Sequence, residues 1–154
     1  MILLLLRSAS AVLAIAALAL PASAWAEELV LHSSTGEYRF NVDVVDTPES
    51  RAQGLMFVTE LADDAGMLFD FKEERPVSFW MRNTFIPLDM IFIDAAGVVK
   101  TVHVNARPHD PTSIPSGVPV RYVLEIAGGR SQEIGLEPGD TVEHDRIGVA
   151  APTP

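Results

Sequence analysis

The sequence contains no cysteine. This absence excludes disulfide bonds, thiol nucleophiles, cysteine-ligated metals and lipid attachment at a cysteine. A small domain of this composition is therefore held together by packing and by noncovalent polar contacts alone.

Positive charge is also scarce. The chain has 11 lysines and arginines against 21 acidic residues, which gives a formal net charge of −10. Nucleic-acid binding depends on neutralising phosphates with Lys and Arg, and docking on an anionic membrane surface has the same requirement. The composition argues against both as partners.

The only long apolar run lies at the N-terminus, where residues 1–26 carry a single charge, that of Arg7. The stretch from Ala9 to Leu20 is shorter than the roughly 20 residues that a membrane-spanning helix needs. It suits the hydrophobic region of a signal peptide, and Ala24-Trp25-Ala26 offers a small-residue cleavage site. We expect a signal peptide over residues 1–26; an uncleaved anchor is the alternative.

Removal of this leader, with its one arginine, would change the net charge from −10 to −11. We expect residues 27–147 to form a single β-rich domain and residues 148–154 to form a disordered Ala/Pro tail. The expected location is periplasmic or secreted, with no stable membrane anchor after cleavage.

The remaining sequence predicts many short strands and two short helices. Tyr38, Phe40, Val42 and Val44 alternate with polar residues, which predicts a strand that pairs in a hairpin with the preceding one. The expected strands are Glu28–His32, Tyr38–Val45, Gly66–Phe71, Pro76–Met81, Leu88–Ile93, Val98–Asn105, Arg121–Ala127 and Thr141–Glu143.

Helix signals occur at two places. Thr47 is a suitable N-cap for a helix over Pro48–Gln53, and Gly54 can end it with a left-handed residue. A second short helix is expected over Arg130–Ile134. Residues 107–119 contain four prolines and predict an irregular loop. The fold class is α+β and mainly antiparallel β: a curled sheet, barrel or sandwich with two short helices packed on it.

Five short motifs follow one another in a characteristic order. They are Gly54-Leu55-Met56, Gly66-Met67-Leu68-Phe69, Phe79-Trp80-Met81-Arg82-Asn83-Thr84, Ile86-Pro87-Leu88-Asp89 and Val123-Leu124-Glu125. The series resembles the family called domain of unknown function 192, from about Leu29 to Arg146. The resemblance implies one compact β-rich domain, often behind an export signal, and implies no activity. The chain departs from the family in having Arg82 where Lys is commoner and Val58 where a basic residue is common.

The third motif and its surroundings supply a candidate ligand-binding patch. Trp80 and Arg82 fall on one face of a regular strand, and Asn83 and Thr84 follow where the chain turns. Arginine suits carboxylate or phosphate, Asn and Thr add hydrogen-bonding groups, and Trp offers a stacking surface. Asp89 opens the next strand and could face Arg82.

Glu125 completes the patch, because a carboxyl in an apolar strand needs either a partner or a raised pKa. Two interpretations remain open. The six residues border a ligand pocket, or Arg82, Asp89 and Glu125 form a closed ion network while Trp80 packs in the core and Asn83 and Thr84 shape a turn. The two interpretations differ in whether a cavity opens beside these residues.

No catalytic residue, cofactor or metal site is assigned, because the chain has neither a nucleophile elbow nor a zinc-protease helix. The favoured function is a non-enzymatic binding module for a small polar or anionic ligand, a saccharide being one candidate. One alternative is an envelope protein–protein interaction domain in which the motif is structural. The other is a carboxylate-based hydrolase that uses Asp89 and Glu125.

Overall fold

The computed structural model describes residues 26–148. The predicted leader and the Ala/Pro tail lie almost wholly outside the described residues. The main sheet contains β1 (Glu27–Ser33), β2 (Gly36–Val45), β3 (Ala65–Arg75), β5 (Leu88–Ile93), β6 (Val99–Ala106), β8 (Val120–Ala127) and β9 (Thr141–Glu143). A smaller sheet pairs β4 (Ser78–Phe79) with β7 (Ile114–Pro115), and the helices are α1 (Pro48–Gln53) and α2 (Arg130–Glu133).

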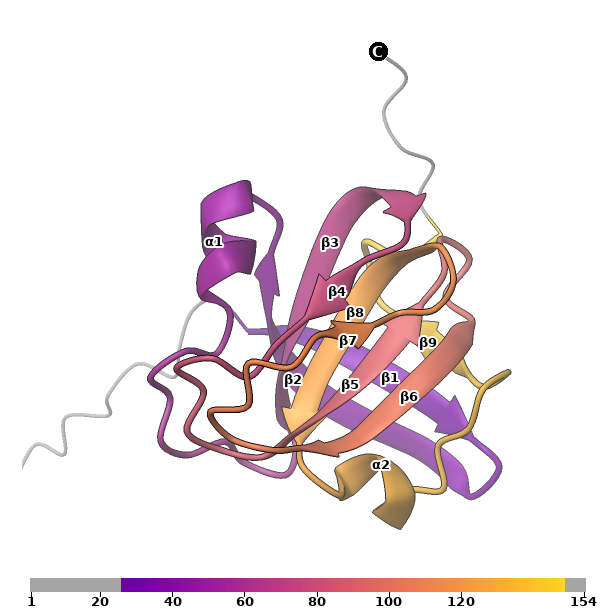
Figure 1. Ribbon diagram of the computed structural model, residues 1–154. Coiled ribbons are helices and arrows are strands. Elements are labelled where there is room, and N and C mark those ends of the chain that lie inside the picture. The colour runs from indigo at the N-terminus through magenta and orange to yellow at the C-terminus, as the bar shows by residue number, and fades with distance from the viewer. Residues whose placement is uncertain (1–25, 149–154) are drawn as a thin grey trace, which may run out of the picture.

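The seven strands of the main sheet follow the order β6-β5-β8-β3-β2-β1-β9. All their pairings are antiparallel except that of β2 with β3, which is parallel. A bridge between Val98 and Thr141 brings the two ends of the sheet together at one corner. The sheet is thus a curled half-barrel (Figure 1), which confirms the predicted α+β, mainly antiparallel class.

Hydrophobic side chains cover both faces of the central strands. One core is enclosed by the curl and takes side chains such as Leu31, Phe40 and Leu124 from β1, β2 and β8. The second core lies on the other face of β3, β5 and β8, under the chain that contains β4 and β7. Side chains that alternate along a strand therefore meet two different environments.

Helix α1 forms as its caps predict. Thr47 Oγ1 accepts a hydrogen bond from Ser50 N at 3.1 Å, and Ser50 Oγ accepts one from Thr47 N at 3.1 Å. This reciprocal cap satisfies two exposed N–H groups. Gly54 follows with a φ of 50°, which glycine adopts without strain.

The structure departs from the prediction at three segments. The strand predicted over Gly66–Phe71 continues to Arg75 beyond an irregularity where Lys72 has a φ of 68°. The strand predicted over Pro76–Met81 is reduced to β4, and the predicted loop 107–119 contributes β7 as its partner. Pro115 limits this small sheet at one end, because proline cannot donate to a ladder.

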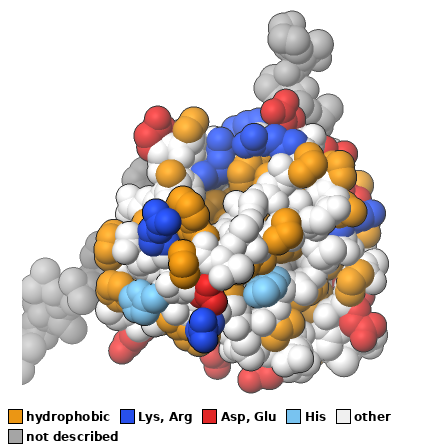
Figure 2. Space-filling model, viewed as in Figure 1, with side chains coloured by type: hydrophobic (Ala, Val, Ile, Leu, Met, Phe, Trp, Pro, Cys, Tyr) orange, Lys and Arg blue, Asp and Glu red, His pale blue; other side chains and the backbone are white. Residues whose placement is uncertain are grey.

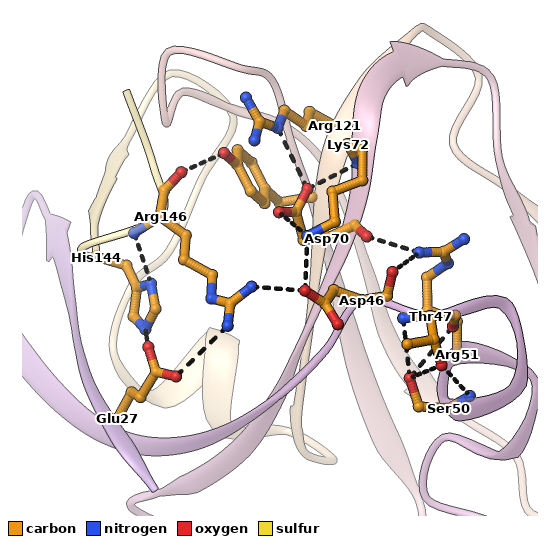
Figure 3. Close-up of polar contacts among 11 residues, drawn as sticks. Glu27, Asp46, Thr47, Ser50, Arg51, Asp70, Lys72, Arg121, His144 and Arg146 are labelled. Carbon is orange, nitrogen blue, oxygen red and sulfur yellow. Dashed lines mark hydrogen bonds and ion pairs between the residues drawn. The ribbon is translucent and has the colours of Figure 1, made fainter. Parts of the chain in front are cut away.

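An ion network fastens the C-terminal segment to the sheet (Figure 3). The Asp46 carboxylate accepts from Lys72 Nζ at 2.6 Å and from Arg146 Nη1 at 2.8 Å. Glu27 lies 3.3 Å from His144 Nε2 and 3.9 Å from Arg146. The hydrogen bonds from Lys72 and then Arg146 hold the pKa of Asp46 below its ordinary value. The Asp46 carboxylate thus joins β3, through Lys72, to the C-terminal segment, through Arg146.

Within residues 26–148, no helix has the length and apolar character needed to cross a membrane.

Candidate functional site

A cavity of about 370 Å³ opens beside β3 and β4. Its wall includes four aromatic side chains, those of Phe69, Phe71, Phe79 and Trp80. Figure 2 shows Lys and Arg side chains gathered along the edge of a hollow that is hydrophobic inside. The size is that of a small-molecule site, for which cavities of about 300–1,000 Å³ are usual.

Two strands of the main sheet, strand β4, helix α1 and the turn after it build this cavity. Helix α1 and the following turn at Gly54 form one side. The irregular end of β3 brings Phe71 and Arg75 to the opening, and β4 with the residue after it supplies Phe79 and Trp80. Strand β8 contributes Glu125, the one acidic side chain among the lining residues.

Glu125 lies between Met67 of β3 and Met90 of β5 in the strand register, and only 4% of it is exposed. No residue in the described part of the chain gives its carboxyl a hydrogen bond or an ion pair. Burial raises the pKa of Glu125 from its ordinary value of 4.5 to about 8. At neutral pH the group is therefore mainly a neutral acid, with an O–H donor and a carbonyl acceptor unused by the protein.

Two arginines line the same cavity. Arg51 donates from Nη1 to the carbonyl oxygens of Asp46 at 2.6 Å and of Asp70 at 2.9 Å, which fixes its position. Arg75 is exposed, and its guanidinium makes no hydrogen bond or salt bridge to the residues that the structure describes. Both guanidinium carbons lie close to the Phe71 ring, at 5.1 and 5.3 Å from its centroid. The lining thus carries positive charge in an acidic protein.

Three of the six predicted patch residues, Trp80, Thr84 and Glu125, line the cavity. Trp80 is 48% exposed, so it belongs to the surface and not to the core. Arg82 is outside the lining, and its guanidinium carbon lies 4.5 Å from the Trp80 ring centroid. The two side chains meet although the strand that was expected to place them on one face ends at Phe79. Asn83 is an exposed turn residue with a φ of 56°.

Asp89 has a structural role. It is completely buried and accepts hydrogen bonds at 2.8 Å from the backbone N–H groups of Asn105, Gly129 and Ser131, and one at 2.5 Å from Ser131 Oγ. The carboxylate fastens the start of α2 and the end of β6 to β5. The expectation that Asp89 faces Arg82 is wrong, because backbone donors and a serine hydroxyl occupy both of its oxygens.

Asp89 and Glu125 also lie on opposite faces of the sheet. Asp89 is paired with Ile126 and Met90 with Glu125, and paired residues of antiparallel strands share a face while adjacent residues alternate. Arg82, Asp89 and Glu125 form no ion pair with one another in the described part of the chain. This geometry separates the two carboxyls that a paired-carboxylate hydrolase would need.

Arg51, Phe71 and Arg75 also line the cavity, and no sequence motif indicated them. Arg75 reaches the cavity only because β3 is irregular between Asp70 and Arg75, and no motif predicts that irregularity. Arg51 lies on the expected helix. That helix is too short to have an apolar face, so its sequence does not show which part of the protein it packs against.

A second, smaller cavity of about 210 Å³ lies beside His103, Arg107 and Asp110. No group of three histidine or acidic side chains among the described residues is arranged to hold a metal ion.

Two solved structures share this fold at substantial sequence identity. A protein from Sinorhizobium meliloti 1021, described as a candidate transcription regulator, has 43% identity and a TM-score of 0.77 over 79% of this chain and 95% of its own. A protein of unknown function from Novosphingobium aromaticivorans DSM 12444 has 40% identity and a TM-score of 0.76 over 80% of this chain and 89% of its own.

A family model described as "Uncharacterized ACR", domain of unknown function 192, matches residues 30–144. No curated protein gives a significant match.

Proposed function

The chain belongs to the domain of unknown function 192 family, and we propose that it is a non-enzymatic binding module that takes a small organic anion into the cavity above Glu125. One observation carries the proposal: a buried carboxyl with no hydrogen-bond or ion-pair partner among residues 26–148 lines an open cavity that has two arginines in its wall. A buried polar group without a hydrogen-bond partner is costly, and ligand sites are where such groups occur.

The wall of the cavity favours an anion with a planar apolar body. Arg75 offers a planar set of donors that suits carboxylate or phosphate. Phe69, Phe71 and Phe79 provide apolar contact surface next to it. A saccharide that stacks on Trp80 fits less well, because Arg82 already lies over that ring.

A second candidate function is a docking domain for an envelope protein. Phe57, Trp80 and Phe85 are exposed, and the Phe57 and Phe85 rings meet edge to face with centroids 5.9 Å apart. Exposed aromatic clusters are common at protein interfaces. Recovery of one stoichiometric partner by the wild type and its loss in Phe57→Ser would support this function over the first.

We further propose that the protein acts outside the cytoplasm, in the periplasm or the medium. The support is the leader pattern of residues 1–26 in the sequence. N-terminal sequencing of protein from fractionated cells should give a chain that begins at Glu27. A chain that retains residues 1–26 in the cytoplasm would contradict this proposal.

Arg75→Ala should abolish most of the anion binding. Titration calorimetry with benzoate, phenyl phosphate and 4-carbamoylbenzoate should show at least one ligand whose Kd rises about 10- to 100-fold in Arg75→Ala, the value of a hydrogen bond to a charged group. Uncharged benzamide should bind both proteins equally.

The matched control is Arg39→Ala, which removes an exposed arginine of β2 whose partner is Glu28. It should leave every Kd unchanged. Failure of all three anions to bind, or equal loss in both variants, would refute the proposed function.

A further inference from the structure

We propose that the cavity binds its anion together with a proton held on Glu125, and that the ligand carries an uncharged amide-like head for this carboxyl and a carboxylate for Arg75. The inference rests on the proposed function and adds to it the ligand class and its dependence on pH.

The surroundings of Glu125 favour the neutral form of its carboxyl. Its neighbours across the strands are Met67 and Met90, and no cation among the described residues contacts its carboxyl. An ionised carboxylate in such a place loses its hydration without compensation. The carboxyl is therefore neutral when a ligand closes the cavity above it.

A neutral carboxyl is complementary to a primary amide. It presents an O–H donor and a carbonyl acceptor side by side in one plane. A primary amide presents the complementary pair, a carbonyl oxygen and an N–H, so the two groups can exchange two hydrogen bonds. A ligand carboxylate in the same place would hold its negative charge against the carbonyl oxygen of the neutral Glu125 carboxyl, which is costly.

The charged end of the ligand is assigned to Arg75. Arg75 is exposed and its guanidinium makes no hydrogen bond or ion pair with the described residues, whereas Arg51 is already held by two carbonyl oxygens. The ligand carboxylate therefore belongs at Arg75, and its amide belongs at Glu125. The aromatic side chains of the wall lie along the body of the ligand.

Binding should then depend on the protonation of Glu125. The charged groups that face the cavity are Arg51 from α1 and Arg75 from β3; β4, β5 and β8 bring no other charged side chain to it besides Glu125. Burial raises the pKa of Glu125 to about 8. Above that pH, deprotonation competes with binding.

The test is titration calorimetry of 4-carbamoylbenzoate with wild type and Glu125→Gln between pH 6 and pH 10. The wild-type affinity should fall about tenfold per pH unit above pH 8 and be constant below pH 7. Glu125→Gln should keep the affinity at pH 6, because its amide also offers a donor and an acceptor, and should lose the pH dependence. At pH 9, buffers of different ionisation enthalpy should show uptake of nearly one proton by the wild type alone.

The outcomes separate the two proposals. Binding that requires Arg75 but has the same affinity at pH 6 and pH 10 would overturn this inference and leave the proposed function. Folded Glu125→Gln protein that does not bind at pH 6 would also overturn it. Benzoate, which lacks the amide, should bind more weakly than 4-carbamoylbenzoate to the wild type, and equally weakly to Glu125→Ala. Failure of every anion to bind would overturn the proposed function itself.

Discussion

Asp89→Ala should lower the free energy of unfolding by about 3–5 kcal/mol, because several donors lose their acceptor at a cost of about 1–3 kcal/mol for each one that stays buried. The substitution leaves three backbone N–H groups and the Ser131 hydroxyl without their acceptor. These donors belong to β6 and to the start of α2, so the loss should loosen both. Urea unfolding followed by circular dichroism measures the effect.

The matched control is Asp43→Ala, which removes an exposed strand carboxylate with no polar partner among the described residues. It should change the stability by less than about 0.5 kcal/mol. The loss of stability in Asp89→Asn should lie between those of Asp89→Ala and Asp43→Ala, because asparagine keeps one acceptor oxygen. A loss below about 1 kcal/mol in Asp89→Ala would show that the carboxylate does not organise this corner.

The stability of the wild type should fall as pH rises from about 5 to 9, relative to that of Glu125→Gln. Burial raises the pKa of Glu125 from 4.5 to about 8 in the folded protein. The folded state therefore binds more protons than the unfolded state between these values. This stabilisation is fully present below pH 4.5 and is lost as the pH rises through 8.

The size of the loss is set by the pKa difference, at about 1.4 kcal/mol per unit, which amounts to several kcal/mol. Glu73→Gln, at an exposed position of β3, is the control and should follow the wild-type profile. His144 acts in the opposite direction, since burial lowers its pKa, but it is common to all three proteins and cancels in the comparison. Parallel profiles for wild type and Glu125→Gln would contradict a neutral Glu125.

Much of the fold follows from local sequence signals. The cap at Thr47 gives α1 its start, and the alternation of Tyr38, Phe40, Val42 and Val44 places these side chains together on the enclosed core. The strand order does not follow in this way. The parallel pairing of β2 with β3 depends on contacts between segments that no local pattern links.

The candidate site, too, could be predicted only in part from local sequence signals. Glu125 in an apolar strand signalled a carboxyl in need of a partner or a raised pKa, and the structure places it in a cavity with Trp80 and Thr84. Asp89 is on the other side of the sheet, because one residue along a strand reverses the face. The predicted patch was assembled from residues that lie near one another in the sequence. In the folded protein, strand pairing determines which of these side chains come together.

Titration of the Glu125 side-chain carboxyl carbon by NMR, with Glu125→Gln used to assign its signal, shows directly whether this buried carboxyl is neutral and takes part in binding. We expect a pKa near 8 for the protein alone and a higher value with 4-carbamoylbenzoate bound. A pKa near the ordinary 4.5 that the ligand does not change would contradict both the neutral carboxyl and its role in binding.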